Sequence, residues 1–178
     1  MRKKRLLACA VSGLAVFSGL AATPLWMRDA KISPDGREIA FSYKGDIYKV
    51  ATTGGRAVRL TTNDAIEGQP SWSPDGRQIA FSSNRYGSDD VFVMPSAGGS
   101  ARRLTFNSSA ETPWGFSADG KEVLFSASIQ DPAKSALYPT SAMTELYAVP
   151  AAGGNIRQVL GTPAEMVAFD KTGKRMLY

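Results

Sequence analysis

A four-residue turn motif recurs along the chain and constrains its fold more than any other feature. The copies, each preceded by an apolar residue, are Ser33-Pro34-Asp35-Gly36, Ser73-Pro74-Asp75-Gly76, Ser117-Ala118-Asp119-Gly120 and the divergent Asp170-Lys171-Thr172-Gly173. In such a tetrad proline presets φ for a type I turn, aspartate caps the turn locally, and glycine takes the left-handed conformation that follows. Apolar residues then alternate with others, as Ile79 and Phe81 do after the second copy. Each copy therefore predicts a hairpin of two antiparallel strands.

A second landmark follows each hairpin. An acidic residue begins an alternating apolar segment, and a Gly-Gly pair stands eight residues after the acid: Asp46 with Gly54-Gly55, Asp90 with Gly98-Gly99, and Glu145 with Gly153-Gly154. Gly-Gly supplies the positive φ of a hairpin turn, so a third strand pairs with a short fourth one, such as Ala101–Thr105. Four antiparallel strands in a repeat of roughly 40–50 residues are typical of a β-propeller blade. A β-sandwich also has short strands, but it would not place the same turn at the same strand pair every time.

The predicted fold is all-β, with about three and a half propeller blades and an incomplete ring. The predicted divisions are a signal peptide over 1–22, blade 1 over 23–61, blade 2 over 62–105, blade 3 over 106–160, and the start of blade 4 over 161–178. Because an incomplete ring leaves unpaired edges, we expect this chain to be the N-terminal piece of a longer protein.

The N-terminus predicts export. Four basic residues, Arg2 to Arg5, precede an apolar stretch from Leu6 to Ala22, and small residues at Gly19 and Ala21 suit cleavage near Ala21 or Ala22. The alternative is an uncleaved membrane anchor, because the stretch approaches the length of a spanning helix. Cys9 lies too early in the apolar run for a lipoprotein site. We expect a periplasmic or secreted protein that meets the membrane only through this segment.

The charge balance argues against nucleic-acid binding. The chain has 21 basic and 16 acidic residues, but without residues 1–22 the remainder has 17 basic against 16 acidic ones. The mature part is therefore almost neutral, without the excess of basic residues typical of nucleic-acid-binding domains.

The composition and the repeats leave few candidates for catalytic residues in this sequence. The sequence contains no histidine, which excludes a Ser-His-Asp triad and the usual zinc sites built from these residues alone. The tetrad aspartates are explained by their turns. The acids that begin the third strands recur in every unit, which favours a structural role, as acceptors for backbone or for a basic residue of a neighbouring blade; a calcium site is the alternative. We expect no catalytic, cofactor-binding or metal-binding residue here.

Candidate contact residues lie in the connections that vary between units. Antiparallel geometry places these connections on the face opposite the tetrads, where a scaffold carries binding residues. The connection 84–90 offers Arg85, whose fork could bind a peptide carboxylate, and Tyr86. The competing interpretation is an ion pair of Arg85 with Asp89 or Asp90 in the same blade. The long connection 127–144 supplies the remaining candidates for peptide or partner contact: Asp131, Lys134 and Tyr138. Trp72, Trp114 and the strand phenylalanines are expected in the core between blades.

The second unit carries a family resemblance. Its segments Trp72–Gly76, Ile79–Arg85, Asp90–Met94, Gly98-Gly99 and Arg103–Thr105 resemble the WD-like propeller repeat of TolB and the tricorn proteases. Three features resemble an exported bacterial tricorn-type serine peptidase: the propeller follows the signal directly, Glu111–Phe116 introduces blade 3, and a long insertion precedes Glu145.

This resemblance implies a non-catalytic propeller that gates or filters peptides for a peptidase core further along the protein. The implied partners are peptide or protein substrates and downstream domains of the same chain; a homo-oligomer is left open. The family's catalytic residues match no position here, so none is carried over. Two alternatives stay open: a TolB-like propeller that binds envelope proteins, and the propeller of a prolyl-oligopeptidase-type hydrolase.

Overall fold

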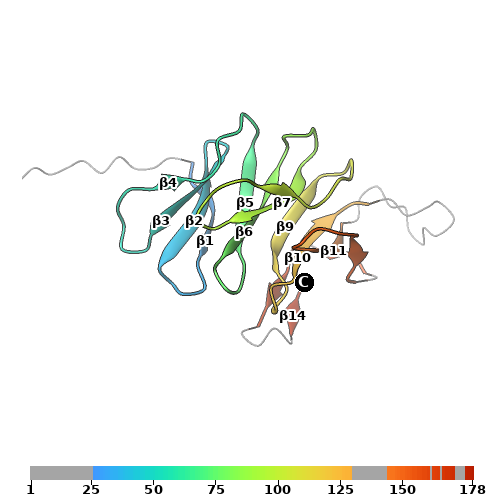
Figure 1. Ribbon diagram of the computed structural model, residues 1–178. Coiled ribbons are helices and arrows are strands. Elements are labelled where there is room, and N and C mark those ends of the chain that lie inside the picture. Colours follow the sequence, from blue (N-terminus) through green and yellow to red (C-terminus); the bar gives the residue numbers. More distant parts are fainter. Residues whose placement is uncertain (1–25, 130–143, 161, 165, 171–174) are drawn as a thin grey trace, which may run out of the picture.

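The computed structural model describes residues 26–129, 144–160, 162–164, 166–170 and 175–178 (Figure 1). All regular secondary structure in this part of the chain is β-strand, which confirms the predicted all-β class. The strands are β1 (Arg28–Ile32), β2 (Glu38–Tyr43), β3 (Asp46–Ala51), β4 (Val58–Arg59), β5 (Glu67–Trp72), β6 (Gln78–Ser83), β7 (Asp90–Pro95), β8 (Arg102–Arg103), β9 (Glu111–Phe116), β10 (Glu122–Ala127), β11 (Glu145–Pro150), β12 (Arg157–Gln158), β13 (Ala168–Phe169) and β14 (Met176–Leu177).

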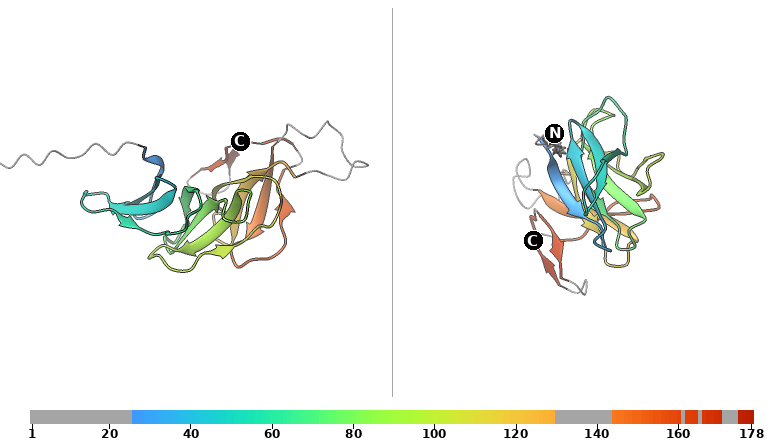
Figure 2. Two further views of the ribbon diagram at one scale, coloured as in Figure 1. Left: turned by 90° about the horizontal axis from the view of Figure 1, so that it is seen from above. Right: turned by 90° about the vertical axis from the view of Figure 1, so that its left-hand side faces the viewer.

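The strands form three four-stranded antiparallel sheets and one two-stranded sheet. The sheets have the orders β1-β2-β3-β4, β5-β6-β7-β8 and β9-β10-β11-β12, and β13 pairs with β14. The first strands of neighbouring sheets, β1, β5 and β9, pack against one another, and the sheets follow one another side by side (Figure 2). This is the arrangement of blades in part of a propeller, as the repeat predicted.

The tetrads of blades 1, 2 and 3 form the same hydrogen-bonded turn between the first two strands of each blade. In blade 2, Gly76 has φ 71° and its N–H donates to Ser73 O at 2.9 Å. The Ser73 hydroxyl donates to Asp75 Oδ1 at 2.6 Å and accepts the Gln78 N–H at 2.9 Å. The turns of blades 1 and 3 repeat these bonds. In the divergent copy, Asp170 Oδ1 accepts the Arg175 N–H at 3.2 Å, so a carboxylate replaces the serine hydroxyl.

Apolar side chains fill the spaces between the blades. Residues of blades 1 and 2 form one cluster, which consists of Ala40, Ile47, Leu60, Trp72, Ile79, Phe81, Phe92 and Met94. Trp72 is 8% exposed, and its indole N–H donates to Lys31 O of blade 1 at 3.0 Å. Trp114 is half-buried against the cluster formed by Leu124, Leu146, Ala148 and Ala164. Both tryptophans therefore serve the core between blades, as expected.

The fourth strands are shorter than the sequence suggested. In blade 2 only Arg102–Arg103 is a strand, although five residues from Ala101 to Thr105 were expected. The Thr105 side chain explains the early end, because its hydroxyl accepts the Val91 N–H at 2.8 Å in place of a backbone carbonyl. Leu104, whose N–H donates to Val91 O at 2.8 Å, is the last residue to continue the ladder.

Candidate functional site

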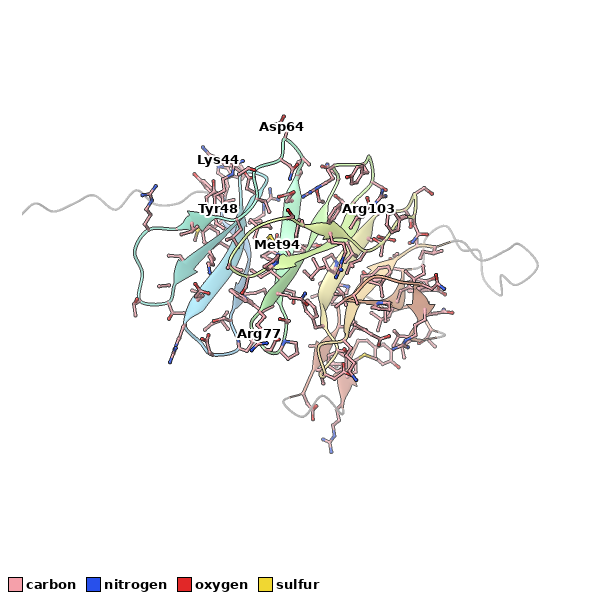
Figure 3. The ribbon with its side chains drawn as sticks, in the orientation of Figure 1. Lys44, Tyr48, Asp64, Arg77, Met94 and Arg103 are labelled. Carbon is pink, nitrogen blue, oxygen red and sulfur yellow. The ribbon has the colours of Figure 1, made fainter. Side chains whose placement is uncertain are left out.

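A cleft of about 610 Å³ opens on the face opposite the tetrad turns. The labelled side chains show the two faces: Lys44 and Asp64 lie at the upper edge of the blades and Arg77 at the lower edge (Figure 3). The starts of β1, β5 and β9 supply the cleft wall, together with the turn between β2 and β3. Its lining residues are Trp26, Arg28, Asp29, Ser42, Tyr43, Lys44, Gly45, Ile66, Glu67, Gly68, Gln69, Ser82, Asp89 and Thr112.

Unusual backbone conformations gather at this cleft. Among the described residues, five non-glycine residues have positive φ, and four of them line the cleft: Trp26, Asp29, Lys44 and Gln69. Lys44 is explained by its two-residue hairpin turn with Gly45, where φ is 51° and 87°. Asp29 and Gln69, at φ 55° and 52°, have no such turn. Residues other than glycine rarely adopt a positive φ, and those that do are found preferentially at functional sites.

Asp29 and Gln69 mark equivalent bulges in neighbouring blades. The register of β1 on β2 shifts between Arg28 and Lys31, and that of β5 on β6 shifts between Gly68 and Ser71. Asp29 Oδ2 accepts the Ser42 hydroxyl at 2.8 Å and the Gln69 N–H at 3.4 Å, which joins the two bulges. The bulges take backbone groups of β1 and β5 out of the ladder beside the cleft, and side chains bond to some of them. The Ser42 hydroxyl donates to Arg28 O at 3.1 Å, and the Ser82 hydroxyl donates to Gly68 O at 3.2 Å.

Arg85 is held inside its own blade, but by a different acid from those expected. Its guanidinium pairs with Glu67 and its Nε–H donates to Ser83 Oγ at 3.0 Å. The side chain is 16% exposed and lies 4.4 Å from the Phe92 ring centroid. The predicted ion pair with Asp89 or Asp90 is therefore wrong in its partner, and the fork proposed for a ligand carboxylate is occupied by Glu67.

Tyr86 is exposed and belongs to a stack on the surface of blade 2. The Arg103 guanidinium carbon lies 4.7 Å from the ring centroids of both Tyr86 and Phe106, which are 64% and 73% exposed. Tyr86 also stacks on Phe92, with centroids 6.2 Å apart. The other sequence candidates, Asp131, Lys134 and Tyr138, lie outside the described residues.

The acids that begin the third strands of blades 1 and 2 pair with arginines of their own blade. Asp46 pairs with Arg59 at 2.8 Å and Asp90 with Arg103 at 2.9 Å. The expected alternative partner, a basic residue of a neighbouring blade, is wrong, because the adjacent fourth strand presents an arginine. Blade 3 has Gln158 in β12 instead, and Glu145 accepts the Tyr147 hydroxyl at 2.5 Å. These contacts give the acids a structural role.

Two buried glutamates that sequence reasoning missed lie at the starts of β5 and β9. Glu67 and Glu111 are each 1% exposed, and each stands six residues before its tetrad serine, a repeated offset that could have drawn attention to them. Burial raises the pKa of Glu111, and the charge of Asp90 adds to the rise, while the Thr105 hydroxyl and the Asn107 amide oppose it. The cleft residues Asp29 and Gln69 have no comparable repeated offset in the sequence that could have identified them.

Neither a metal centre nor a membrane span is visible in the described ranges. Among these residues, no three acidic, histidine or cysteine side chains are grouped as metal ligands would be. The same ranges hold no helix of the length and apolarity that a bilayer crossing requires.

Comparison with known proteins places this chain in a family. Residues 24–178 match the family model described as the tricorn protease N-terminal β-propeller domain. The chain belongs to this family. The curated proteins contain no match.

Solved structures share the propeller fold of this chain. TolB from Acinetobacter baumannii has 25% identity and a TM-score of 0.64, over 84% of this chain and 36% of TolB. The tricorn protease has 17% identity and a TM-score of 0.53, over 70% of this chain and 13% of the protease. An acylaminoacyl peptidase, solved with Z-Gly-Gly-Phe-chloromethyl ketone, has 14% identity and a TM-score of 0.60, over 85% of this chain and 27% of the peptidase. The chain thus spans well under half the length of each of these relatives.

Proposed function

We propose that this propeller is the non-catalytic part of an exported tricorn-type serine peptidase. In this proposal the cleft binds a segment of a peptide or protein substrate, and the propeller filters its access to a catalytic domain elsewhere in the whole protein. The observation that carries the proposal is the cleft, at which the paired bulges of Asp29 and Gln69 meet. Family membership supports the peptidase, and the basic and apolar N-terminal segment supports export.

The chemistry of the cleft suits an extended peptide. At the bulges, Arg28 O and Gly68 O each accept a serine hydroxyl and have a second lone pair that a peptide N–H can use. Apart from the buried Glu67, the charged lining residues are of both signs, so they can contact charged side chains or termini of either sign: Arg28, Lys44, Asp29 and Asp89. Lining residues come from three successive blades, which allows a segment to cross the blade starts.

Peptide binding by the intact protein tests this proposal. A labelled, unstructured peptide mixture is titrated while fluorescence anisotropy is followed, and Arg28→Ala in the cleft is compared with Arg77→Ala on the tetrad face. Loss of one charge-assisted hydrogen bond should weaken binding about tenfold for Arg28→Ala. Arg77→Ala should leave the affinity unchanged. Equal effects of the two substitutions, or no peptide binding, would contradict the proposal.

A TolB-like binding propeller is the second candidate, and the 25% identity with TolB over 84% of the chain favours it. In that case the whole protein would bind a partner at the same cleft and cleave nothing. Mass spectrometry of peptides incubated with the intact protein separates the two functions. Cleavage products that a serine-directed inhibitor abolishes support the peptidase, and binding without products supports the TolB-like function.

A further inference from the structure

The contact between blades 1 and 2 and the contact between blades 2 and 3, here called joints, contain the same buried acid, but their described residues differ by one positive charge. Glu67 and Glu111 occupy equivalent places, because their N–H groups donate to Gly45 O and Asp89 O, each at 2.8 Å, across the joint to the preceding blade. Each lies opposite the last residue of the following strand, Ser83 for Glu67 and Ala127 for Glu111. The surroundings of the two carboxylates can therefore be compared position by position.

The joint between blades 1 and 2 compensates its carboxylate. Glu67 Oε1 accepts from the Arg85 guanidinium, and the Ser83 hydroxyl donates to the same oxygen at 3.4 Å. The guanidinium is held in place by its stacking on Phe92. In this buried ion pair the positive charge of Arg85 lies in direct contact with the carboxylate.

Among the described residues, which exclude 130–143, the joint between blades 2 and 3 has no equivalent cation. Ile129 stands two residues after Ala127, where Arg85 stands two residues after Ser83, and it packs against the apolar cluster of this joint. Glu111 Oε1 accepts from Asn107 Nδ2 at 2.7 Å, and Glu111 Oε2, like Glu67 Oε2 at the other joint, has no hydrogen-bond partner. The difference is the cation, without which an ionised carboxylate in such a buried place is costly.

The neighbouring strands add no free positive charge. Asp90 on β7 is fully buried, and its Oδ2 has no hydrogen-bond partner either. Arg103 on β8 pairs with Asp90 Oδ1, and its Nε lacks a partner. Strand β5 presents Glu67 with its own Arg85, and β10 presents Ala127 at this end. The joint thus contains two buried carboxylates against one guanidinium.

We propose that the joint between blades 2 and 3 is a proton-operated joint, tight when Glu111 is protonated and loosened when it is ionised. A proton supplies the positive charge that Arg85 supplies at the other joint. The raised pKa of Glu111 supports the sign: the stabilisation is complete below the ordinary glutamate pKa near 4.5 and is lost as pH rises through the higher folded-state value.

The joint lies directly behind the candidate cleft. Thr112 follows Glu111 in β9, and Asp89 accepts the Glu111 N–H; both residues line the cleft. Loosening of the joint at higher pH would therefore shift the part of the cleft wall that β9 forms, and would weaken ligand binding. This consequence rests on the proposed function, whereas the behaviour of the joint does not.

Hydrogen exchange in the intact protein tests the joint, with the other joint as an internal control. Protection factors, corrected for the intrinsic pH dependence of amide exchange, are compared between β9 and β5 at pH 5 and pH 8. We expect the protection of β9 to fall about tenfold more than that of β5. Glu111→Gln keeps the Asn107 contact without a charge and should abolish the difference, as should Ile129→Arg, which restores the missing cation while Glu111 stays in place.

Two results would overturn the proposal: equal pH dependence of β9 and β5 in the wild-type protein, or an unchanged difference in a folded Glu111→Gln or Ile129→Arg protein. If one variant does not fold, the other gives the answer. Peptide affinity is measured separately on the same samples. If the protection of β9 depends on pH but no peptide binds, the proposed function is refuted and the proposal for the joint is supported. If peptide binds but the protection does not depend on pH, the proposal for the joint is refuted and the proposed function is supported.

Discussion

Replacing Arg85 by methionine would convert the joint between blades 1 and 2 into a copy of the uncompensated one. Methionine keeps an unbranched stem that can pack on Phe92, but it removes the guanidinium from Glu67. The Glu67 side chain is 0% exposed and that of Arg85 is 16% exposed, so water cannot replace the lost cation without opening the joint. The Ser83 hydroxyl would be left as the remaining side-chain donor to Glu67.

The expected magnitude follows from this burial. Removing one partner of a buried ion pair costs about 3–5 kcal/mol, because the other charge is left uncompensated. The Phe92 contact adds about 1 kcal/mol of cation–π attraction, part of which a methionine–aromatic contact returns. We therefore expect the opening free energy of β5 to fall by about 4 kcal/mol, or roughly a thousandfold in protection factor. Removing both charges, in Glu67→Gln with Arg85→Met, should restore most of this loss.

Hydrogen exchange of residues 67–72 in the intact protein measures the effect. The matched control is Arg77→Met, which removes an 86% exposed guanidinium 4.0 Å from Asp75 and should change protection by no more than about 0.5 kcal/mol. A loss below threefold for Arg85→Met would refute the structural role of the pair. If peptide affinity falls while protection stays intact, Arg85 is instead a ligand-binding fork.

The tetrad turn yields two further predictions, both read by exchange in β5 and β6. Ser73→Ala removes a 2% exposed hydroxyl that holds the Gln78 N–H and should cost about 1–2 kcal/mol. The Ser73 hydrogen bond is the largest cause of the lowered pKa of Asp75, and a lowered pKa gives stability that is lost as pH falls below about 3.8. Without this bond, the variant should lose less stability than the wild-type protein over the same pH range. Gly76→Ala should cost about 1–2 kcal/mol, because alanine is strained at the φ of 71° that Gly76 adopts. Steric overlap adds nothing to this cost, since the nearest atom, Pro34 Cδ, lies 3.9 Å from the new Cβ. An effect below 0.3 kcal/mol for either substitution would contradict this account of the turn.

Local turn chemistry made the blades predictable from sequence. Ser73, Asp75 and Gly76 satisfy one another within a few residues, so their spacing alone implies the hairpin. The same holds for the Gly-Gly turns, where Gly98 and Gly99 have φ of 89° and 125°. Strand pairing and the core between blades then follow from the repeat.

The candidate site was less predictable, because it depends on contacts between distant residues. Arg85 had two acids nearby in sequence, Asp89 and Asp90, yet it pairs with Glu67 across the first and second strands. Asp90 is unavailable because the fourth strand brings Arg103 to it. The cleft was still harder to foresee, since the bulge at Asp29 reflects packing between blades and has no marker residue such as glycine.

The repeat itself indicates where the functional differences between blades lie. On the tetrad face, three blades form the same serine–aspartate–glycine network with hydrogen bonds that agree within 0.1 Å. On the opposite face the blades diverge: a two-residue turn at Lys44-Gly45 in blade 1, a stacked aromatic at Tyr86 in blade 2, and Ile129 in place of an arginine in blade 3. Identical turns are enough to build the scaffold. A departure that leaves a buried carboxylate without its cation lowers stability, and proteins retain such strain where it serves function. The cleft, the bulges and the Glu111 joint all lie on this divergent face, so substitutions there should alter binding and its pH dependence, whereas substitutions in the tetrads should alter stability alone.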